Sequence, residues 1–417
     1  MEKTPFEKDL LDRFLRYVQV DTMSDPHVTD RRPTTAGQMD LLRMVDKELA
    51  DFGITDRYFD PNGYLIARLP SNLPGGRVVK TIGFMAHVDT ADDVMGNGVK
   101  PRIIDAYDGK DILLNSQYTL SVEDNPALVD YIGKTLVVTD GTTLLGADDK
   151  AGLAIIMSVA KRLVEDHSIL HGDVEFIITT DEETGAGMDL FPIKKINSSC
   201  CYTLDGGPYG ELEAECFNAS TVNVTFTGVP FHLGAARGKM VNSVTMATRF
   251  IASLPQSESP EATDGRYGYY CAHEIQGTAE KTELTLYLRD FDLDQLKRRI
   301  NVLVQLGKTI EALFPGGSVT IENKFVYYNM YDTIKKNPQV LEAVRESART
   351  LGIVLHEKVI RGGTDGARLA ELGIPAPNIF TGGHNYHSRF EWAALPTMVS
   401  AANLVQQIIV YWGGLSG

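Results

Sequence analysis

Long hydrophobic runs are missing from this sequence of 417 residues. Nowhere do about 18 apolar residues follow one another, which is the least that a membrane-spanning helix needs. The opening residues, MEKTPFEKDL, are charged and lead directly into a helical pattern, so they do not resemble a secretory signal. We therefore expect a protein that does not span a membrane and is not secreted.

Positive charge and cysteine are also scarce. The chain has 40 lysine and arginine residues against 55 aspartate and glutamate residues, and its formal net charge is -15. A surface this acidic repels phosphate backbones, which argues against nucleic acid as a partner. The four cysteines, at positions 200, 201, 216 and 271, form no CxxC pair, so neither a zinc ribbon nor a disulfide framework is indicated. This use of cysteine fits the reducing cytoplasm, where we expect the protein to act.

The sequence does contain a regular alternation of apolar strands and helices, and it is interrupted once. In residues 1–208 and 325–417, buried strands such as Val174–Thr179 alternate with helices such as Lys150–Leu163, which indicates an α/β domain whose sheet is covered by helices. Residues 209–324 read instead as strand, strand, helix, strand, strand, helix, strand, with the polar–apolar alternation of an antiparallel sheet. We therefore expect a discontinuous α/β domain with an inserted α+β domain.

Residues of the kinds that bind metal ions stand at the ends of the predicted strands, where open α/β sheets form their sites. Five segments have this character: His87-Val88-Asp89, Gly146-Ala147-Asp148-Asp149-Lys150-Ala151-Gly152, Thr180-Asp181-Glu182-Glu183-Thr184-Gly185, Asp205, and His387-Ser388-Arg389-Phe390-Glu391. Each alone has a simpler explanation, such as a hydrogen-bonded histidine, a helix N-cap, a charged turn or a polar loop. Together, two histidines and several carboxylates without cysteine suit a hydrolytic zinc site with hard ligands.

These segments also carry a family resemblance. The motifs HxD, GADDKAG, DEETG, LDGG and HSxxE, in this order and with an inserted domain between the last two, resemble those of the M20 metallopeptidases. The phrases GVPFHLGAARGKMVN, LYLRDFD, YYNMYD and IRGGTDGARLA make the resemblance closest to the tripeptide aminopeptidases of that family, and it covers essentially the whole chain. It implies a zinc-peptidase-like α/β domain with a central mixed sheet, and an inserted ferredoxin-like domain that serves as lid and dimer interface. It also implies that the enzyme removes the N-terminal residue from tripeptides.

The resemblance implies two zinc ions per subunit and a role for each residue of the motifs. The implied ligands are His87, Asp148, Glu183, Asp205 and His387. Asp148 would bind both ions, and the peptide bond after it would be cis. Glu182 would be the general base, and Asp89 would support the ring of His87. His384 lies near His387 but does not fit HSxxE, so we favour His387.

The resemblance also points to residues that would bind the substrate, a short peptide with a free N-terminus. These are His232, Arg289, Asn329 and Arg361. Arginine suits the peptide carboxylate because its fork binds bidentately. Related enzymes pair through the inserted domain, so we expect a homodimer in which His232 reaches the partner's site.

Two rival functions remain open. One is another M20 amidohydrolase: a dipeptidase, a carboxypeptidase or an N-acyl amino acid deacylase. The other is a catalytically silent binding protein, against which the base Glu182 speaks.

Overall fold

The structure, a computed structural model, describes residues 2–415 and falls into two units. The first unit comprises residues 1–214, 333–358 and 364–417, and the second comprises residues 215–332 and 359–363. The second unit is therefore an insertion into the first. The lid and dimer-interface roles expected for it stay predictions.

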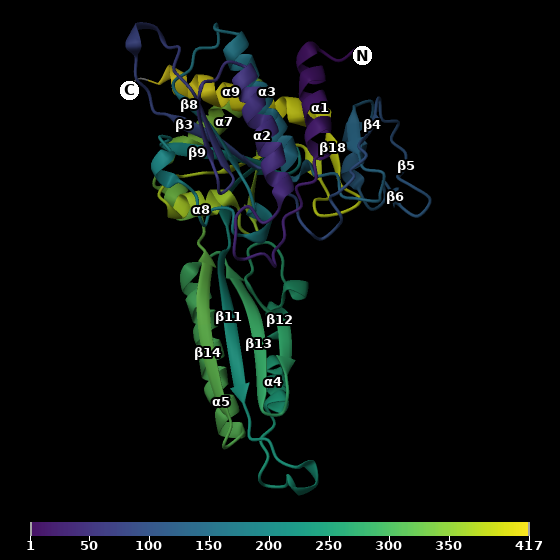
Figure 1. The fold of residues 1–417 in the computed structure, drawn as a ribbon, viewed down its shortest axis with the longest axis vertical. Helices are drawn as coiled ribbons and strands as arrows, with labels where there is room; N and C mark the ends of the chain where they lie inside the picture. The colour runs from purple at the N-terminus through teal and green to yellow at the C-terminus, as the bar shows by residue number, and fades with distance from the viewer. Residues whose placement is uncertain (1, 416–417) are drawn as a thin grey trace. The chain divides into compact units, whose positions relative to one another are not determined.

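An eight-stranded sheet forms the centre of the first unit, in the order β1-β2-β8-β3-β9-β16-β10-β15 (Figure 1). The strands are β1 Asp56–Asp60, β2 Tyr64–Leu69, β3 Ile82–His87, β8 Val174–Thr179, β9 Cys200–Gly206, β10 Glu211–Cys216, β15 His356–Ile360 and β16 Asn378–Phe380. Strands β8, β3, β9 and β16 run parallel, whereas β1, β2 and β10 pair antiparallel to their neighbours. This confirms the predicted α/β fold with a central mixed sheet.

Helices cover this sheet. The helices of the first unit are α1 Pro5–Val18, α2 Ala36–Asp51, α3 Ala147–Glu165, α7 Gln339–Leu351, α8 Asp365–Glu371 and α9 Leu395–Gly414. The short helix α6 Tyr331–Lys335 begins in the second unit and ends in the first. Helix α1 begins with the capping box that Thr4 and Glu7 form. Helix α3 packs against β3 and β9 and also against α1 and α9, so it is buried along most of its length. Its first turn is therefore held close to the carboxyl ends of the parallel strands. No helix within residues 2–415 is both long enough and apolar enough to cross a membrane.

A second, smaller sheet of the first unit has the order β17-β18-β7-β4. Its strands are β4 Arg102–Ile104, β7 Leu136–Val138, β17 Gly383–His384 and β18 Trp392–Ala394, and β5 Ile112–Leu113 pairs with β6 Thr119–Leu120 beside it. Trp392 is buried against Leu136 and Val138 in the core of this region. The turn between β17 and β18 carries the HSxxE motif, so its position is set by this sheet.

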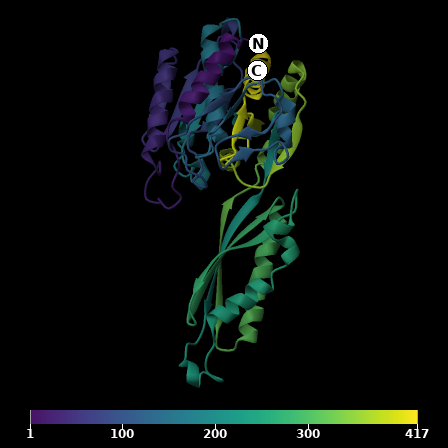
Figure 2. The same ribbon diagram turned by 90° about the vertical axis from the view of Figure 1, so that its right-hand side faces the viewer.

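The second unit has a four-stranded antiparallel sheet in the order β12-β13-β11-β14. Its elements are β11 Asn218–Thr227, α4 Ser243–Ala252, β12 Tyr269–Gly277, β13 Lys281–Asp290, α5 Leu293–Leu313 and β14 Ser318–Tyr327. Both helices lie on one side of the sheet (Figure 2). Buried and exposed residues alternate along β11, with Phe226 packed against Phe250. The chain order β-α-β-β-α-β is that of ferredoxin-like folds.

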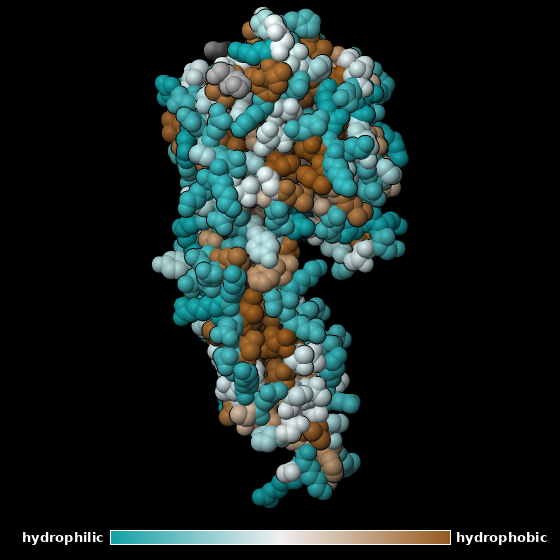
Figure 3. Space-filling view, turned by 90° about the vertical axis from the view of Figure 1, so that its left-hand side faces the viewer, coloured by the Kyte–Doolittle hydropathy of each residue, from teal (hydrophilic) through white to brown (hydrophobic). Residues whose placement is uncertain are grey.

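Hydrophilic residues make up most of the face of the molecule shown in Figure 3, with apolar residues in smaller patches between them.

Two exposed apolar residues belong to a loop of the second unit: Phe231 is 42% exposed and Leu233 is 80% exposed. They flank His232, so this histidine lies in an exposed and partly apolar segment.

Candidate functional site

The predicted strand ends do meet at one edge of the large sheet. Strands β8, β3 and β9 are parallel neighbours, so their carboxyl ends lie side by side. His87 is the last residue of β3, Asp205 lies near the end of β9, and Glu182 and Glu183 follow β8 in a short 3-10 helix. Three segments that are far apart in the sequence thus bring their acidic and imidazole groups together.

Asp148 lies between the two predicted histidine ligands. His87 Nε2 is 3.1 Å from Asp148 Oδ1 and 3.5 Å from Asp205 Oδ1. His387 Nε2 is 3.4 Å from Asp148 Oδ2 and 3.0 Å from Glu183 Oε2. Each carboxylate oxygen of Asp148 therefore faces a different histidine, which creates two adjacent groups of possible ligands around one shared residue.

The acidic groups of this cluster lie close together, with the imidazoles of His87 and His387 between them. Burial and the neighbouring Asp148 raise the pKa of Glu183 to about 7, and its Oε1 atom is buried without a hydrogen-bond partner. Burial and other carboxylates also raise the pKa of Glu182 and of Asp205 well above the usual range. Close carboxylates repel one another unless a cation lies between them.

The donor set is also chemically right for a divalent cation. Two groups of side chains have ligand atoms within 4.8 Å of one another: His87 with Asp149 and Asp205, and His87 with Asp148 and Glu183. The donors are imidazole nitrogens and carboxylate oxygens, which suit zinc and similar cations. Together with the unpartnered oxygen of Glu183, this set fits a metal centre.

Asp89 connects two of the segments, as a residue expected to support His87 should. Its backbone oxygen is 3.1 Å from His87 Nδ1, and its Oδ1 is 3.3 Å from the same nitrogen. Its two oxygens also accept the backbone N–H groups of Glu182 and Glu183, both at 3.1 Å. One fully buried carboxylate thus orients a histidine ring and fixes the turn that carries Glu182.

Asp148 and Asp149 have different environments. The peptide bond between them is cis, as the family resemblance implied. Asp149 accepts the backbone N–H of His87 at 3.3 Å and that of Gly152 at 3.1 Å, so its oxygens serve the backbone. Asp148 instead turns its oxygens to the two histidines. Because burial is offset by hydrogen bonds from His387 and His87, the pKa of Asp148 lies below its usual range.

The structure brings His387, and not His384, to the cluster. His387 has a left-handed backbone with φ of 57°, which is uncommon outside glycine and turns its ring toward Asp148. His384 stacks on Trp392 with ring centroids 3.8 Å apart, and burial lowers the pKa of His384 to about 4.

Several supporting residues were not predicted from the sequence. Asp93 Oδ2 is 3.1 Å from His387 Nδ1, the carboxylate–histidine arrangement that commonly fixes a metal-binding imidazole. Asp181 accepts hydrogen bonds from Thr34 and Gln38, which belong to a segment about 150 residues earlier. Glu391 accepts backbone N–H groups from the segment before Asp148. Glu391 is part of the HSxxE motif, so the sequence indicated this residue. No local sequence pattern predicted the backbone groups that it binds.

The four residues expected to bind substrate all belong to the second unit. His232 is exposed at the start of a 3-10 helix. Arg289 lies over the rings of Tyr287 and Tyr327. Asn329 accepts the N–H of Cys216, and Arg361 donates to backbone oxygens of residues 263, 265 and 267. The guanidinium of Arg361 and the amide of Asn329 are thus already bonded within the unit, and all four substrate roles stay predictions.

Comparison with known proteins agrees with this geometry. The profile of peptidase family M20/M25/M40 matches residues 138–411. The chain is 44% identical to Peptidase T of Geobacillus thermodenitrificans over 405 residues, which cover 97% of this chain and 98% of that protein. It is 43% identical to Peptidase T of Bacillus subtilis over 404 residues, or 96% of this chain and 98% of that protein.

Solved structures give the same result. Aminopeptidase PepT from Bacillus cereus superposes with a TM-score of 0.76 and 25% identity, over 97% of this chain and 98% of that one. A dinuclear metal-binding M20 peptidase from Bacillus subtilis shares the fold with a TM-score of 0.67 at 16% identity, over 97% and 98% of the two chains. The resemblance inferred from the motifs is confirmed: the chain belongs to peptidase family M20/M25/M40.

Proposed function

We propose that this protein is an aminopeptidase that removes the N-terminal residue from tripeptides, with two zinc ions per subunit and Glu182 as general base. Family membership supports a hydrolase of this family, and the near full-length identity to Peptidase T supports the tripeptide substrate. The single observation that carries the chemistry is Asp148, which faces His87 with one oxygen and His387 with the other. The four cysteines are free thiols in the structure, which fits the proposed action in the cytoplasm.

The proposed ligands divide around Asp148. His87 and Asp205 would hold one ion, His387 and Glu183 would hold the other, and Asp148 would bind both. The chemistry that two such ions supply is Lewis-acid polarisation of the peptide carbonyl and a lowered pKa of the attacking water. Asp89 contacts Nδ1 of His87, and Asp93 contacts Nδ1 of His387, so each aspartate would keep one imidazole ring in place.

Glu182 is proposed to take the proton of the attacking water and return it to the leaving amine. Its backbone N–H donates to Asp89, and its side chain is partly buried beside the cluster. Burial and neighbouring carboxylates raise the pKa of Glu182. A general base works best when its pKa lies near the working pH.

Removal of metal is expected to abolish activity without unfolding the protein. Chelated protein should keep its far-UV circular dichroism spectrum but release no amino acid from a tripeptide, and added zinc should restore turnover. Its melting temperature should fall, because a bound ion stabilises the folded state. Full activity after verified removal of metal would show that the mechanism is wrong.

Glu182→Gln is expected to lower kcat by about 10²–10⁴, the usual contribution of a general base, with metal content nearly unchanged. The amide keeps the size of the side chain but cannot accept the proton. The matched control is Glu183→Gln, which removes a proposed ligand and should therefore lower the metal content as well. Retained activity in Glu182→Gln would assign the base to another residue.

The substrate is expected to need a free α-amino group. In a panel of di-, tri- and tetrapeptides, each free and N-acetylated, the free tripeptides should be cleaved best, with release of the first residue. The N-acetyl forms should be poor substrates. Rapid hydrolysis of N-acetyl amino acids would instead favour a deacylase, which is the main rival within the family.

We further propose a homodimer paired through the second unit, in which His232 donates a hydrogen bond to the oxyanion in the partner's site. Such a contact is typically worth a few kcal/mol. Its exposure, beside the exposed Phe231 and Leu233, is compatible with this role. Glu182→Gln and His232→Ala should each be nearly inactive alone.

Mixing these two variants tests whether His232 of one subunit acts in the site of the other. With random pairing, half of the dimers are mixed and one of their two sites is intact, so about a quarter of wild-type activity should return. If no activity returns after subunit exchange has been demonstrated, His232 does not act across the dimer.

A further inference from the structure

Glu391 has an unusual set of partners for a buried acid. It is 1% exposed, and its two oxygens accept the N–H groups of four successive residues. Oε2 accepts those of Leu145 and Gly146 at 2.7 Å, and Oε1 accepts those of Ala147 at 2.7 Å and Asp148 at 3.2 Å.

The four N–H groups can converge because the chain turns sharply at Gly146, where φ is 80°. This left-handed conformation is easy for glycine and directs successive amides to one side, as in an anion-binding nest. The segment is also the N-terminus of α3, whose first N–H groups have no partner within the helix. A carboxylate from a distant part of the chain thus accepts the N–H groups at the start of α3 that have no partner within the helix.

The same carboxylate lies directly behind a proposed ligand. Asp148 is the last of the four donors, and its side chain faces both histidines. Glu391 in turn follows His387 by four residues, and its own N–H donates to Ser388. One short turn therefore delivers His387 and also holds the backbone of Asp148.

We propose that Glu391 is a positioning residue that sets the place of the Asp148 carboxylate relative to His387, and so the spacing of the two cation sites. The inference rests on the proposed metal-dependent function. A displacement of about 1 Å at such a site is enough to impair it severely. The competing explanation is that Glu391 only caps α3 and stabilises the fold.

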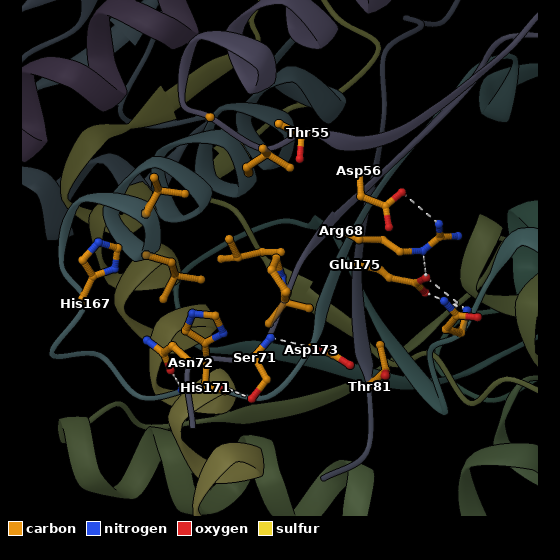
Figure 4. Close-up of a pocket in the computed structure, with 18 residues that line it drawn as sticks. Thr55, Asp56, Arg68, Ser71, Asn72, Thr81, His167, His171, Asp173 and Glu175 are labelled. Atoms are coloured by element: carbon orange, nitrogen blue, oxygen red, sulfur yellow. Dashed lines mark hydrogen bonds and ion pairs between the residues drawn. The ribbon is translucent and has the colours of Figure 1, made fainter. Parts of the chain in front are cut away.

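Glu175 offers a matched control near the amino end of β8, whereas the cluster lies at the carboxyl ends of the parallel strands. It is fully buried and accepts the N–H groups of Asn197 and Ser198 at 2.9–3.1 Å, and it also pairs with Arg68. Glu175 lines a pocket of about 620 Å³, together with Thr81, which precedes β3, and Val174, which begins β8. Figure 4 labels Glu175 and Thr81 in this pocket. Glu175→Gln thus removes a buried backbone-binding acid far from the proposed cations.

The test compares full-length wild type, Glu391→Gln, Glu391→Asp and Glu175→Gln, with cobalt(II) as the probe. Cobalt affinity is measured by competition with a chromophoric chelator, and the visible absorption spectrum reports the ligand geometry. The kcat and KM values for a tripeptide and the melting temperature are measured on the same samples. An amide at position 391 retains one acceptor oxygen and places an NH₂ group against two N–H donors.

For Glu391→Gln we expect cobalt affinity and kcat to fall by about ten- to hundredfold, with an altered spectrum and a KM within about twofold of wild type. Glu391→Asp keeps the charge on a shorter side chain, so it should retain part of the cobalt affinity and kcat that Glu391→Gln loses. It also provides the test if the glutamine variant does not fold. Glu175→Gln should lower only the melting temperature.

The inference is overturned if the position-391 variants keep wild-type affinity, spectrum and kcat while losing stability to the extent that Glu175→Gln does. If wild type itself shows no metal-dependent turnover, the proposed function fails, and the inference falls with it. The two failures are distinguishable because the first leaves a metal-dependent wild type.

Discussion

The crowding of acidic side chains at one edge of the sheet is the constraint on which the structure of this site depends. Asp148, Glu182, Glu183 and Asp205 approach one another with only two imidazoles among them, and burial makes their repulsion more costly. A folded chain can hold such a group only if its positions are fixed from outside and if positive charge is available. The imidazoles of His87 and His387 pair with Asp148, Asp205 and Glu183, and the buried Oε1 of Glu183 has no hydrogen-bond partner among the described side chains.

Hydrogen bonds to backbone amides hold much of the cluster in position. They are accepted by further acidic side chains that lie outside the cluster. Asp89 accepts the N–H groups of the turn after β8, and Glu391 accepts those at the start of α3. Asp181 accepts the N–H and hydroxyl of Thr34. Amide donors stabilise a buried carboxylate without adding a mobile side chain, so these contacts lock the loops. Each links segments that are distant in the sequence.

This long-range bonding explains how far the sequence could predict the structure. The order of strands and helices, and the position of His87 and Asp205 at strand ends, followed from periodicity. The choice of His387 over His384 followed from the family resemblance, because only His387 fits the HSxxE motif. Asp93, Asp181 and the partners of Glu391 did not, because a hydrogen bond between residues 34 and 181, or 146 and 391, leaves no local pattern. The left-handed backbone of His387 is likewise produced by tertiary contacts and not by residue type.

The division of the chain explains why the motifs identified the family more firmly than the substrate. Every residue of the acidic cluster belongs to the first unit, whereas the four residues expected to bind the peptide belong to the second. Dipeptidases, carboxypeptidases and deacylases can therefore share the cluster, because their differences need only involve the residues that contact the rest of the substrate. Arg361 shows the difficulty of transferring such residues by motif, since its guanidinium already holds a loop of its own unit.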